Sequence, residues 1–364
     1  MANPYPAIGY RSLDGGVLEI IGGYPGMKRP YQVDTYALSR QSAIFKMAVA
    51  LGGISVAFAL VFSSLARADD GMLKVVATTG MIADAARQIG GERVVVKALM
   101  GPGVDPHAYR QTRTDIVALA KADLVLWHGL YLEAQMEDFL VALGKRHQTV
   151  AVAEALPKDL LLSHADYADK YDPHVWMDPQ RWAKVISAVS DALSSVKPDA
   201  KATFEANAAR HLGDVTKLAA YAEKSLATVP AESRVLLTAH DAFNYFGEAY
   251  QFEVLGIQGI STESEAGLNR IRELVDVLVT RNISAVFIES SVSDRNIKAL
   301  IEGAAAEGHT VTIGGELFSD AMGRDGTYEG TYLGMIDHNI TVVTRALGGS
   351  APERGMTGKL AASS

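Results

Sequence analysis

Three histidines and one aspartate are spread along the chain at wide and nearly even intervals. His107, His174, His240 and Asp320 are separated by 67, 66 and 80 residues, and each lies in a loop-like segment that follows a predicted strand. Residues this far apart cannot form a local motif, because no single turn or helix brings them together. The spacing predicts a fold that delivers one side chain from each of four strand-to-helix loops to a single point.

The chemistry of these four side chains indicates a metal site. Imidazole nitrogens and a carboxylate oxygen are ligands that suit Zn²⁺ and its first-row neighbours. The 364 residues include no cysteine, which excludes disulfides, thiolate metal sites and cysteine nucleophiles, so a metal is held by nitrogen and oxygen alone. The net charge is −8 and no run of Lys or Arg occurs, so we expect no nucleic-acid partner.

Residues 1–68 are predicted to be a leader that contains a signal peptide. Arg40 and Lys46 precede an uncharged run over 47–65, and an Ala-x-Ala pattern ends at Ala68. A membrane anchor is the alternative, because the run of 19 residues is just long enough to span a bilayer. Its glycines, serines and small-residue exit favour cleavage after Ala68. No cysteine follows to carry a lipid, so we expect a soluble, periplasmic protein.

From Leu73 onwards, short apolar runs alternate with amphipathic helical segments, one of them over 131–144. This pattern predicts an α/β fold with parallel sheets that are covered on both faces. The expected strands of an N-terminal lobe, residues 69–197, are 73–79, 93–100, 122–129 and 148–155. The expected strands of a C-terminal lobe, residues 230–348, are 234–240, 253–259, 285–291 and 309–317.

Two consecutive helices interrupt the alternation between the lobes. The first is predicted from Pro179 to Val196, and the second covers a linking segment, 198–229. A helix of nearly 30 residues is about 45 Å long, which suggests a rigid rod that joins the two lobes. Ligands of open α/β sheets bind beyond the carboxyl ends of the strands, so we place the metal in the cleft between the lobes. The tail, 349–364, is predicted to be disordered.

Seven motifs between residues 72 and 347 carry a family resemblance. In order they are DPH-x-Y, GL-x-LE, DPHVWMDP, TAHDAF-x-YF, GIQG-x-STE-x-EAG, FIESSVSDRN and GGELFSDA. Together they resemble the cluster A-I metal-binding proteins, the solute-binding components of zinc and manganese ABC transporters. The treponemal-type members, with three His and one Asp, are the most similar. Zinc-uptake members usually carry a long His-rich loop before the second ligand, but the segment 157–173 is short and contains only His164.

The resemblance implies metal capture without catalysis. The protein is expected to take up Zn²⁺ or Mn²⁺ in the periplasm and to deliver it, as a monomer, to a membrane permease driven by an ATPase. The implied ligands are His107, His174, His240 and Asp320. Without the resemblance, His107 reads as a surface residue, His174 as part of a turn before a helix, and His240 as a buried structural histidine. Asp320 could be a helix cap, with Glu316 as a rival carboxylate.

Other polar residues allow two interpretations. Trp127, Glu133 and Glu289 either orient the ligands or serve ordinary packing. His164 is a candidate for a transient role in metal acquisition. The remaining histidines are expected to be surface or structural residues, namely His128, His147, His211, His309 and His338.

Two other classes of function compete with transport. A zinc site with an open position activates water in metallohydrolases. Against an enzyme, the sequence has no HExxH-type motif, no evident general base, and four ligands that would close a tetrahedral shell. An adhesin-like interaction protein is the third class, but no lipid anchor or repeat supports it. The metal stays open: the four ligands suit Zn²⁺, whereas a bidentate Asp320 would give the five donors that suit Mn²⁺.

Overall fold

The computed structural model describes four stretches of the chain, which are residues 9–13, 17–21, 71–164 and 167–361. The chain divides into two compact units, Met1–Ala68 and Asp69–Ser364. In the first unit, β1 (Gly9–Leu13) and β2 (Val17–Ile21) pair in antiparallel fashion. The predicted apolar run of the signal peptide and the cleavage position after Ala68 lie outside the described residues.

The N-terminal lobe of the second unit contains a four-stranded parallel sheet in the order β4-β3-β5-β6. Its strands are β3 (Leu73–Ala77), β4 (Val94–Ala98), β5 (Leu124–Trp127) and β6 (Thr149–Ala151). Successive side chains of a strand point to opposite faces, so Val75 and Val76 belong to different cores. Val75 packs with α2 (Gly80–Gly90), and Val76 packs with α3 (Arg113–Ala120) and α4 (Glu137–Gly144). The central strands are therefore buried on both faces, as their continuous apolar runs predict.

The C-terminal lobe repeats this arrangement. Parallel pairs form between β7 (Val235–Thr238) and β8 (Glu253–Gly256), and between β9 (Ala285–Glu289) and β10 (Thr312–Leu317). Strand β7 lies beside β9, so the spatial order β8-β7-β9-β10 matches that of the first lobe. The helices of this lobe are α7 (Asn244–Tyr250), α8 (Leu268–Thr280), α9 (Arg295–Ala306) and α10 (Tyr332–Ala346). The parallel, two-lobed α/β architecture expected from the sequence is confirmed.

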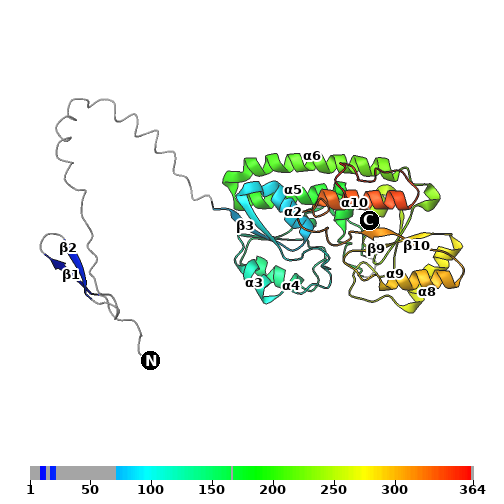
Figure 1. Ribbon diagram of the computed structural model, residues 1–364, viewed down its shortest axis with the longest axis horizontal. Helices are drawn as coiled ribbons and strands as arrows, with labels where there is room; N and C mark the ends of the chain where they lie inside the picture. The colour runs from blue at the N-terminus through cyan, green and yellow to red at the C-terminus, as the bar shows by residue number, and fades with distance from the viewer. Residues whose placement is uncertain (1–8, 14–16, 22–70, 165–166, 362–364) are drawn as a thin grey trace, which may run out of the picture. The chain divides into compact units, whose positions relative to one another are not determined.

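A long helix ends the N-terminal lobe, and a second one joins the two lobes. Helix α5 (Pro179–Val196) begins where the Asp178 carboxylate accepts a hydrogen bond from the Gln180 amide at 2.8 Å, with proline at the first helical position. A 3-10 turn, Pro198–Ala200, leads into α6 (Lys201–Leu226), whose 26 residues span about 39 Å. Helix α6 packs against α2 and α5 from one lobe and against α10 from the other (Figure 1). The predicted long joining helix is confirmed.

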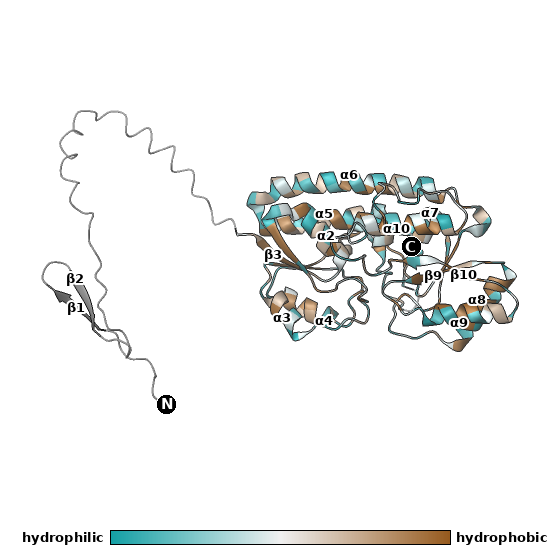
Figure 2. Ribbon diagram, viewed as in Figure 1, coloured by the Kyte–Doolittle hydropathy of each residue, from teal (hydrophilic) through white to brown (hydrophobic). Residues whose placement is uncertain are grey.

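One hydrophobic core runs through both lobes. It unites buried residues of β3, α2, α5 and α6 with those of α7 and α10. Figure 2 shows hydrophobic colour on the interior strands, such as β3, and hydrophilic colour along much of α6. A continuous core of close-packed side chains resists relative movement of the parts that it joins. Within the described residues, no helix combines the length and apolar character that crossing a bilayer requires.

The helix predicted over 131–144 begins only at Glu137. Gly129, Leu130 and Tyr131 have positive φ angles of 82°, 54° and 69°, which a right-handed helix does not allow. The buried Glu133 carboxylate stabilises this turn, because it accepts hydrogen bonds from the backbone amides of His128 and Gly129 at 2.7 and 3.1 Å. The hydrogen bonds from these two amides to Glu133 therefore outweigh the helix propensity of this segment.

The tail predicted to be disordered is ordered over residues 349–361, so that prediction is wrong for this stretch. The backbone amide of Met356 donates to both carboxylate oxygens of Asp337 on α10, at 2.9 and 3.0 Å. Leu360 is buried, and the amide of Ala361 donates to Glu329 at 2.7 Å. Asp337 is fully buried and needs such donors, and composition alone did not reveal that requirement.

Candidate metal centre

The four side chains predicted from their spacing converge at one point between the lobes. One ligand atom from each of His107, His174, His240 and Asp320 lies within 4.8 Å of every other. His107 lies on the loop after β4, and His174 lies just before α5. His240 follows β7, and Asp320 follows β10. All four are at most 2% exposed, so the carboxyl ends of the strands deliver them into an interior that excludes water.

The distances between these atoms fit a single metal ion. The Nε2 atoms of His107 and His174 are 3.2 Å apart. Asp320 Oδ1 lies 3.4 Å from His174 Nε2, and Asp320 Oδ2 lies 3.2 Å from His240 Nε2. Ligand atoms at 2.0–2.1 Å from a tetrahedral ion are about 3.3 Å from one another. These three separations therefore match those of a coordination shell, and both carboxylate oxygens of Asp320 face the cluster.

Two polar atoms of the cluster are buried and form no hydrogen bond within the part of the chain that the structure describes. His240 Nε2 and Asp320 Oδ1 are buried without a hydrogen-bond partner among the described residues. Buried polar atoms are nearly always paired, and leaving one unpaired costs about 1–3 kcal/mol. A cation at the centre of the cluster would satisfy both atoms.

Carboxylates on the far side of two imidazole rings set their orientation. His174 Nδ1 lies 2.7 Å from Asp172 Oδ1, and the Asn244 amide in turn donates to Asp172 Oδ2 at 3.1 Å. His240 Nδ1 lies 2.5 Å from one oxygen of Glu289, whose other oxygen accepts from the His240 backbone amide at 2.8 Å. A proton held on Nδ1 leaves the Nε2 lone pair free to bind a metal. Once an incoming metal displaces the proton from Nε2, each ring therefore presents the tautomer that coordinates.

His107 is held in a different way. Its backbone amide donates to Asp105 Oδ1 at 2.8 Å, two residues earlier in the same loop. Its ring packs against those of His174 and His240, with centroid separations of 5.3 and 5.9 Å. The hydrogen bond positions the main chain of His107, and the neighbouring rings confine the imidazole.

The electrostatic environment separates His107 from His174. Burial lowers the pKa of His107 to about 3. Burial also acts to lower the pKa of His174, but the charges of Asp172 and Asp320 outweigh it and raise that pKa to about 9. Burial acts to raise the pKa of Asp320, but attraction to His240 and the close approach of the His174 and His240 rings outweigh it and hold that pKa well below its ordinary value. The metal-free cluster thus holds a carboxylate beside a protonated His174 and a neutral His107.

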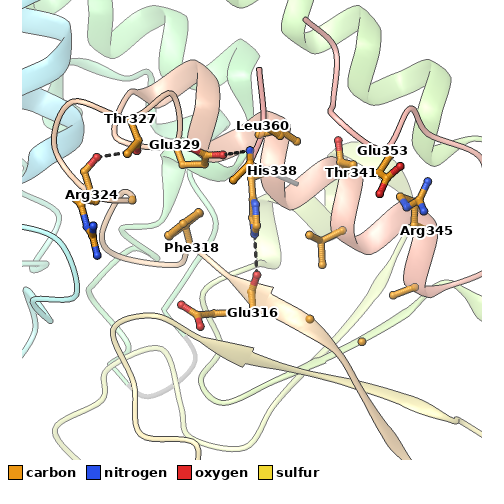
Figure 3. Close-up of a pocket in the computed structure, with 16 residues that line it drawn as sticks. Glu316, Phe318, Arg324, Thr327, Glu329, His338, Thr341, Arg345, Glu353 and Leu360 are labelled. Carbon is orange, nitrogen blue, oxygen red and sulfur yellow. Dashed lines mark hydrogen bonds between the residues drawn. The ribbon is translucent and has the colours of Figure 1, made fainter. Parts of the chain in front are cut away.

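Glu316, the rival of Asp320, lies outside the metal centre. It lines a cavity of about 560 Å³ beside α10, and none of the four converging residues lines that cavity (Figure 3). Its backbone carbonyl accepts a hydrogen bond from His338 Nε2 at 2.9 Å, which the figure marks with a dashed line. The structure therefore distinguishes the two carboxylates that sequence reasoning could not separate.

Among the residues with two interpretations, Glu289 contacts a candidate ligand, whereas Trp127 packs in the core with α3 and α4. Sequence reasoning missed Asp172. A signal was present, because the Asp-Pro-His triplet occurs twice, and in both copies the aspartate binds the backbone amide of its histidine. His128 is structural, as expected, and its Nε2 donates to the carbonyl of Pro173, beside His174, at 2.7 Å.

Two similar α/β lobes, an interlobe helix and a buried His₃Asp cluster define a class of metal-binding protein with two rigid halves. The family model described as zinc-uptake complex component A, periplasmic, matches residues 75–346. The chain belongs to this family. It is a solute-binding component of an ABC import system, which is a non-enzymatic role.

Two curated relatives cover most of the chain. A manganese-binding lipoprotein, MntA, from Bacillus subtilis is 49% identical over 284 residues, which are 78% of this chain and 92% of the relative. A zinc-binding protein, TroA, from Treponema pallidum is 45% identical over 295 residues, which are 81% and 95% of the two chains. The solved structure of the periplasmic zinc-binding TroA from T. pallidum matches with a TM-score of 0.74 over 76% of this chain and 99% of that one. The names of these relatives specify different metals.

Proposed function

We propose that the protein captures Zn²⁺ or Mn²⁺ outside the cytoplasmic membrane and delivers it to the permease of an ABC importer. His107, His174, His240 and Asp320 are the proposed ligands. The observation that carries the proposal is the spacing of their donor atoms, 3.2–3.4 Å between neighbours, in a buried cluster. This spacing matches the edges of a tetrahedral shell with bonds of about 2.0–2.1 Å.

The donor set accommodates either metal. Three imidazoles and one carboxylate oxygen complete the four-coordinate shell that Zn²⁺ prefers. Because both oxygens of Asp320 face the cluster, bidentate coordination would give five donors, which suits Mn²⁺ better. Zinc should bind more tightly in vitro whichever metal is transported, since affinity rises from Mn²⁺ to Zn²⁺ along the first row.

The proposal extends to the location and the partners of the protein. The leader, 1–68, would direct export and be removed after Ala68, which leaves a soluble periplasmic protein. This mature chain would act as a monomer and bind a cognate permease together with its ATPase. The lobes, 69–197 and 230–348, would supply two ligands each, with the segment 198–229 as the connection.

Metal titration of the protein after chelator treatment tests the proposal. Zn²⁺ and Mn²⁺ are titrated in parallel into the native chain, His240→Ala and Asp320→Ala, with His338→Ala and Glu316→Ala as controls from outside the cluster. We expect one tight site per chain that both cluster variants weaken and both controls retain. The proposal fails if no stoichiometric site is found, or if binding is indifferent to the loss of His240 and Asp320.

A further inference from the structure

A segment of the C-terminal lobe crosses to the N-terminal lobe beside the metal centre. It covers residues 257–267, between β8 and α8. The Thr262 hydroxyl donates to Asp105 Oδ2 at 2.5 Å, and Gln135 donates to the Glu263 carboxylate. Thr262 and Glu263 belong to one lobe, while Asp105 and Gln135 belong to the other. These two hydrogen bonds therefore join the lobes at the strand ends from which the ligands project.

The Asp105 carboxylate has two partners, one on each side. Its Oδ1 accepts from the backbone amide of His107 at 2.8 Å, and its Oδ2 accepts from Thr262. A threonine of the C-terminal lobe is thus connected through one carboxylate to a ligand of the N-terminal lobe. His174 and His240 differ, because carboxylates hold their rings directly through Nδ1.

The crossing segment is itself anchored beside another ligand. The Gln258 side chain donates to the backbone carbonyls of Thr262 and Ser264 at 3.4 and 3.1 Å. The carbonyl of Gly259 accepts from the amide of Asp241, the residue after His240, at 3.2 Å. Thr262 is therefore held in a fixed place relative to His240. Its bond to Asp105 links the ligand loops of the two lobes.

The loop that carries His107 has open space beside it. A cavity of about 250 Å³ is lined by Gly101, Pro102 and Val104 of this loop and by Asp320 of the opposite lobe. Another lobe-to-lobe connection is the shared core of α5, α6 and α10, which resists displacement. The loop that carries His107 therefore has fewer packing constraints than this shared core.

We propose that the Asp105–Thr262 hydrogen bond is an interlobe clasp that holds His107 in the metal centre and sets the rate at which the metal leaves. This inference rests on the proposed function, since it concerns the same metal. Opening of the clasp frees the Asp105 side of the loop, so His107 withdraws first and the metal is left with three protein ligands. Asp105 and Thr262 are positioning residues, because they act on the metal only through His107.

The experiment measures metal dissociation by stopped-flow mixing of the Zn²⁺-loaded protein with excess chelator. Thr262→Val removes the hydroxyl and keeps the shape, and Thr262→Ser restores a hydroxyl. Ser264→Ala, in the same segment, is the matched control. A hydrogen bond to a charged group contributes enough to change a rate about tenfold. We expect Thr262→Val to release zinc about tenfold faster, with the Ser variant and the control near the native rate.

A double-mutant cycle separates the clasp from a general loosening of the fold. Asp105→Ala already breaks the clasp, so adding Thr262→Val to it should not accelerate release further. The thermal midpoint of each metal-free variant shows whether the fold is intact. The cycle stays informative even if one single variant is destabilised.

Three results overturn the clasp while the proposed function stands. They are a Thr262→Val variant that binds one zinc and releases it at the native rate, a Ser264→Ala control that is equally fast, and additive effects in the cycle. Failure of the native protein to bind a stoichiometric metal is a different outcome. It removes the proposed function, and the clasp with it.

Discussion

The Trp176 indole Nε1 donates a hydrogen bond of 2.8 Å to the carbonyl of Ser319, the residue directly before Asp320. The same indole packs against the ring of His174, with centroids 5.2 Å apart. The Tyr332 hydroxyl on α10 donates to the Trp176 carbonyl at 2.9 Å. One buried side chain thus sets the relative positions of two candidate ligands that come from different lobes.

Replacement of Trp176 by phenylalanine should destabilise this junction. The ring contact with His174 is largely retained, but the buried carbonyl of Ser319 loses its donor, which costs about 1–3 kcal/mol. Urea unfolding of the metal-free protein measures the change in the free energy of unfolding. Trp182→Phe is the control, because Trp182 is equally buried and its Nε1 has no partner among the described residues. Equal losses in both variants would contradict the role of the Trp176 bond.

Glu289→Gln should weaken metal binding without removing a ligand. The amide side chain cannot supply the negative charge that holds the proton on His240 Nδ1, so the Nε2 lone pair becomes a poorer donor. Loss of such a partner typically lowers metal affinity about 10-fold to 100-fold. Competition with a chromophoric chelator gives the dissociation constant. Glu316→Gln, which alters a carboxylate outside the cluster, should leave it unchanged, and a native affinity in Glu289→Gln would refute the prediction.

Metal binding should release protons at neutral pH. Because the pKa of His174 is raised to about 9, the metal-free protein carries a proton there that an incoming metal displaces. His107, with a pKa of about 3, is already neutral and adds no competition at neutral pH. Affinity should therefore rise from pH 6 until about pH 9. Calorimetry at pH 7 in buffers of different ionisation enthalpy should detect release of at least one proton per metal, and none released would be inconsistent with the raised pKa.

The raised pKa of His174 also affects the stability of the metal-free fold. This stability should fall as the pH rises, whereas metal affinity should increase. A folded-state pKa above the ordinary 6.5 contributes stability that is complete below that pH and is lost as the pH rises through about 9. Thermal unfolding of the chelator-treated protein should therefore show a lower midpoint at pH 9.5 than at pH 6.5. The metal-loaded protein should not show this loss, because the metal replaces the proton on His174.

His240→Glu should change the preference between metals. It replaces a nitrogen ligand with a harder oxygen donor, which favours Mn²⁺ relative to Zn²⁺. Parallel titrations should show a smaller ratio of zinc affinity to manganese affinity than in the native protein, because the zinc affinity falls. His338→Glu, on α10 and outside the cluster, is the control for added charge. An unchanged ratio in His240→Glu would show that this position does not set selectivity.

Much of the fold and of the cluster could be predicted because strong local patterns coincide. The apolar runs around Val75, Val125 and Val286 predict buried parallel strands, and a histidine or aspartate after a strand is placed at the edge where ligands meet. Wide spacing then suggested a shared site, since each of the four residues lies in one strand-to-helix connection, and the family resemblance was needed to select the four residues as ligands. For Asp320, the resemblance was the only ground for preferring it to Glu316.

The parts that could not be predicted depend on side-chain contacts that no periodic pattern in the sequence marks. Glu133 binds amides of the turn before α4, which shortens the helix expected there, and Asp337 holds the C-terminal segment to α10. Neither carboxylate belongs to a periodic pattern that marks its partner. Trp176 was missed because its partner Ser319 is 143 residues away. Asp172 lies only two residues before His174, and the repeated Asp-Pro-His triplet was a signal that could have found it.

The burial of all four candidate ligands affects which metal ions the site can bind. An ion that enters a pocket with side chains at most 2% exposed must shed essentially its whole hydration shell. Mg²⁺ gives up water reluctantly and demands octahedral oxygen ligands, so three imidazoles compensate it poorly for dehydration. Rejection of the abundant magnesium ion thus requires no dedicated filter. Burial of the ligands itself disfavours any cation that holds its water more strongly than nitrogen donors can replace it.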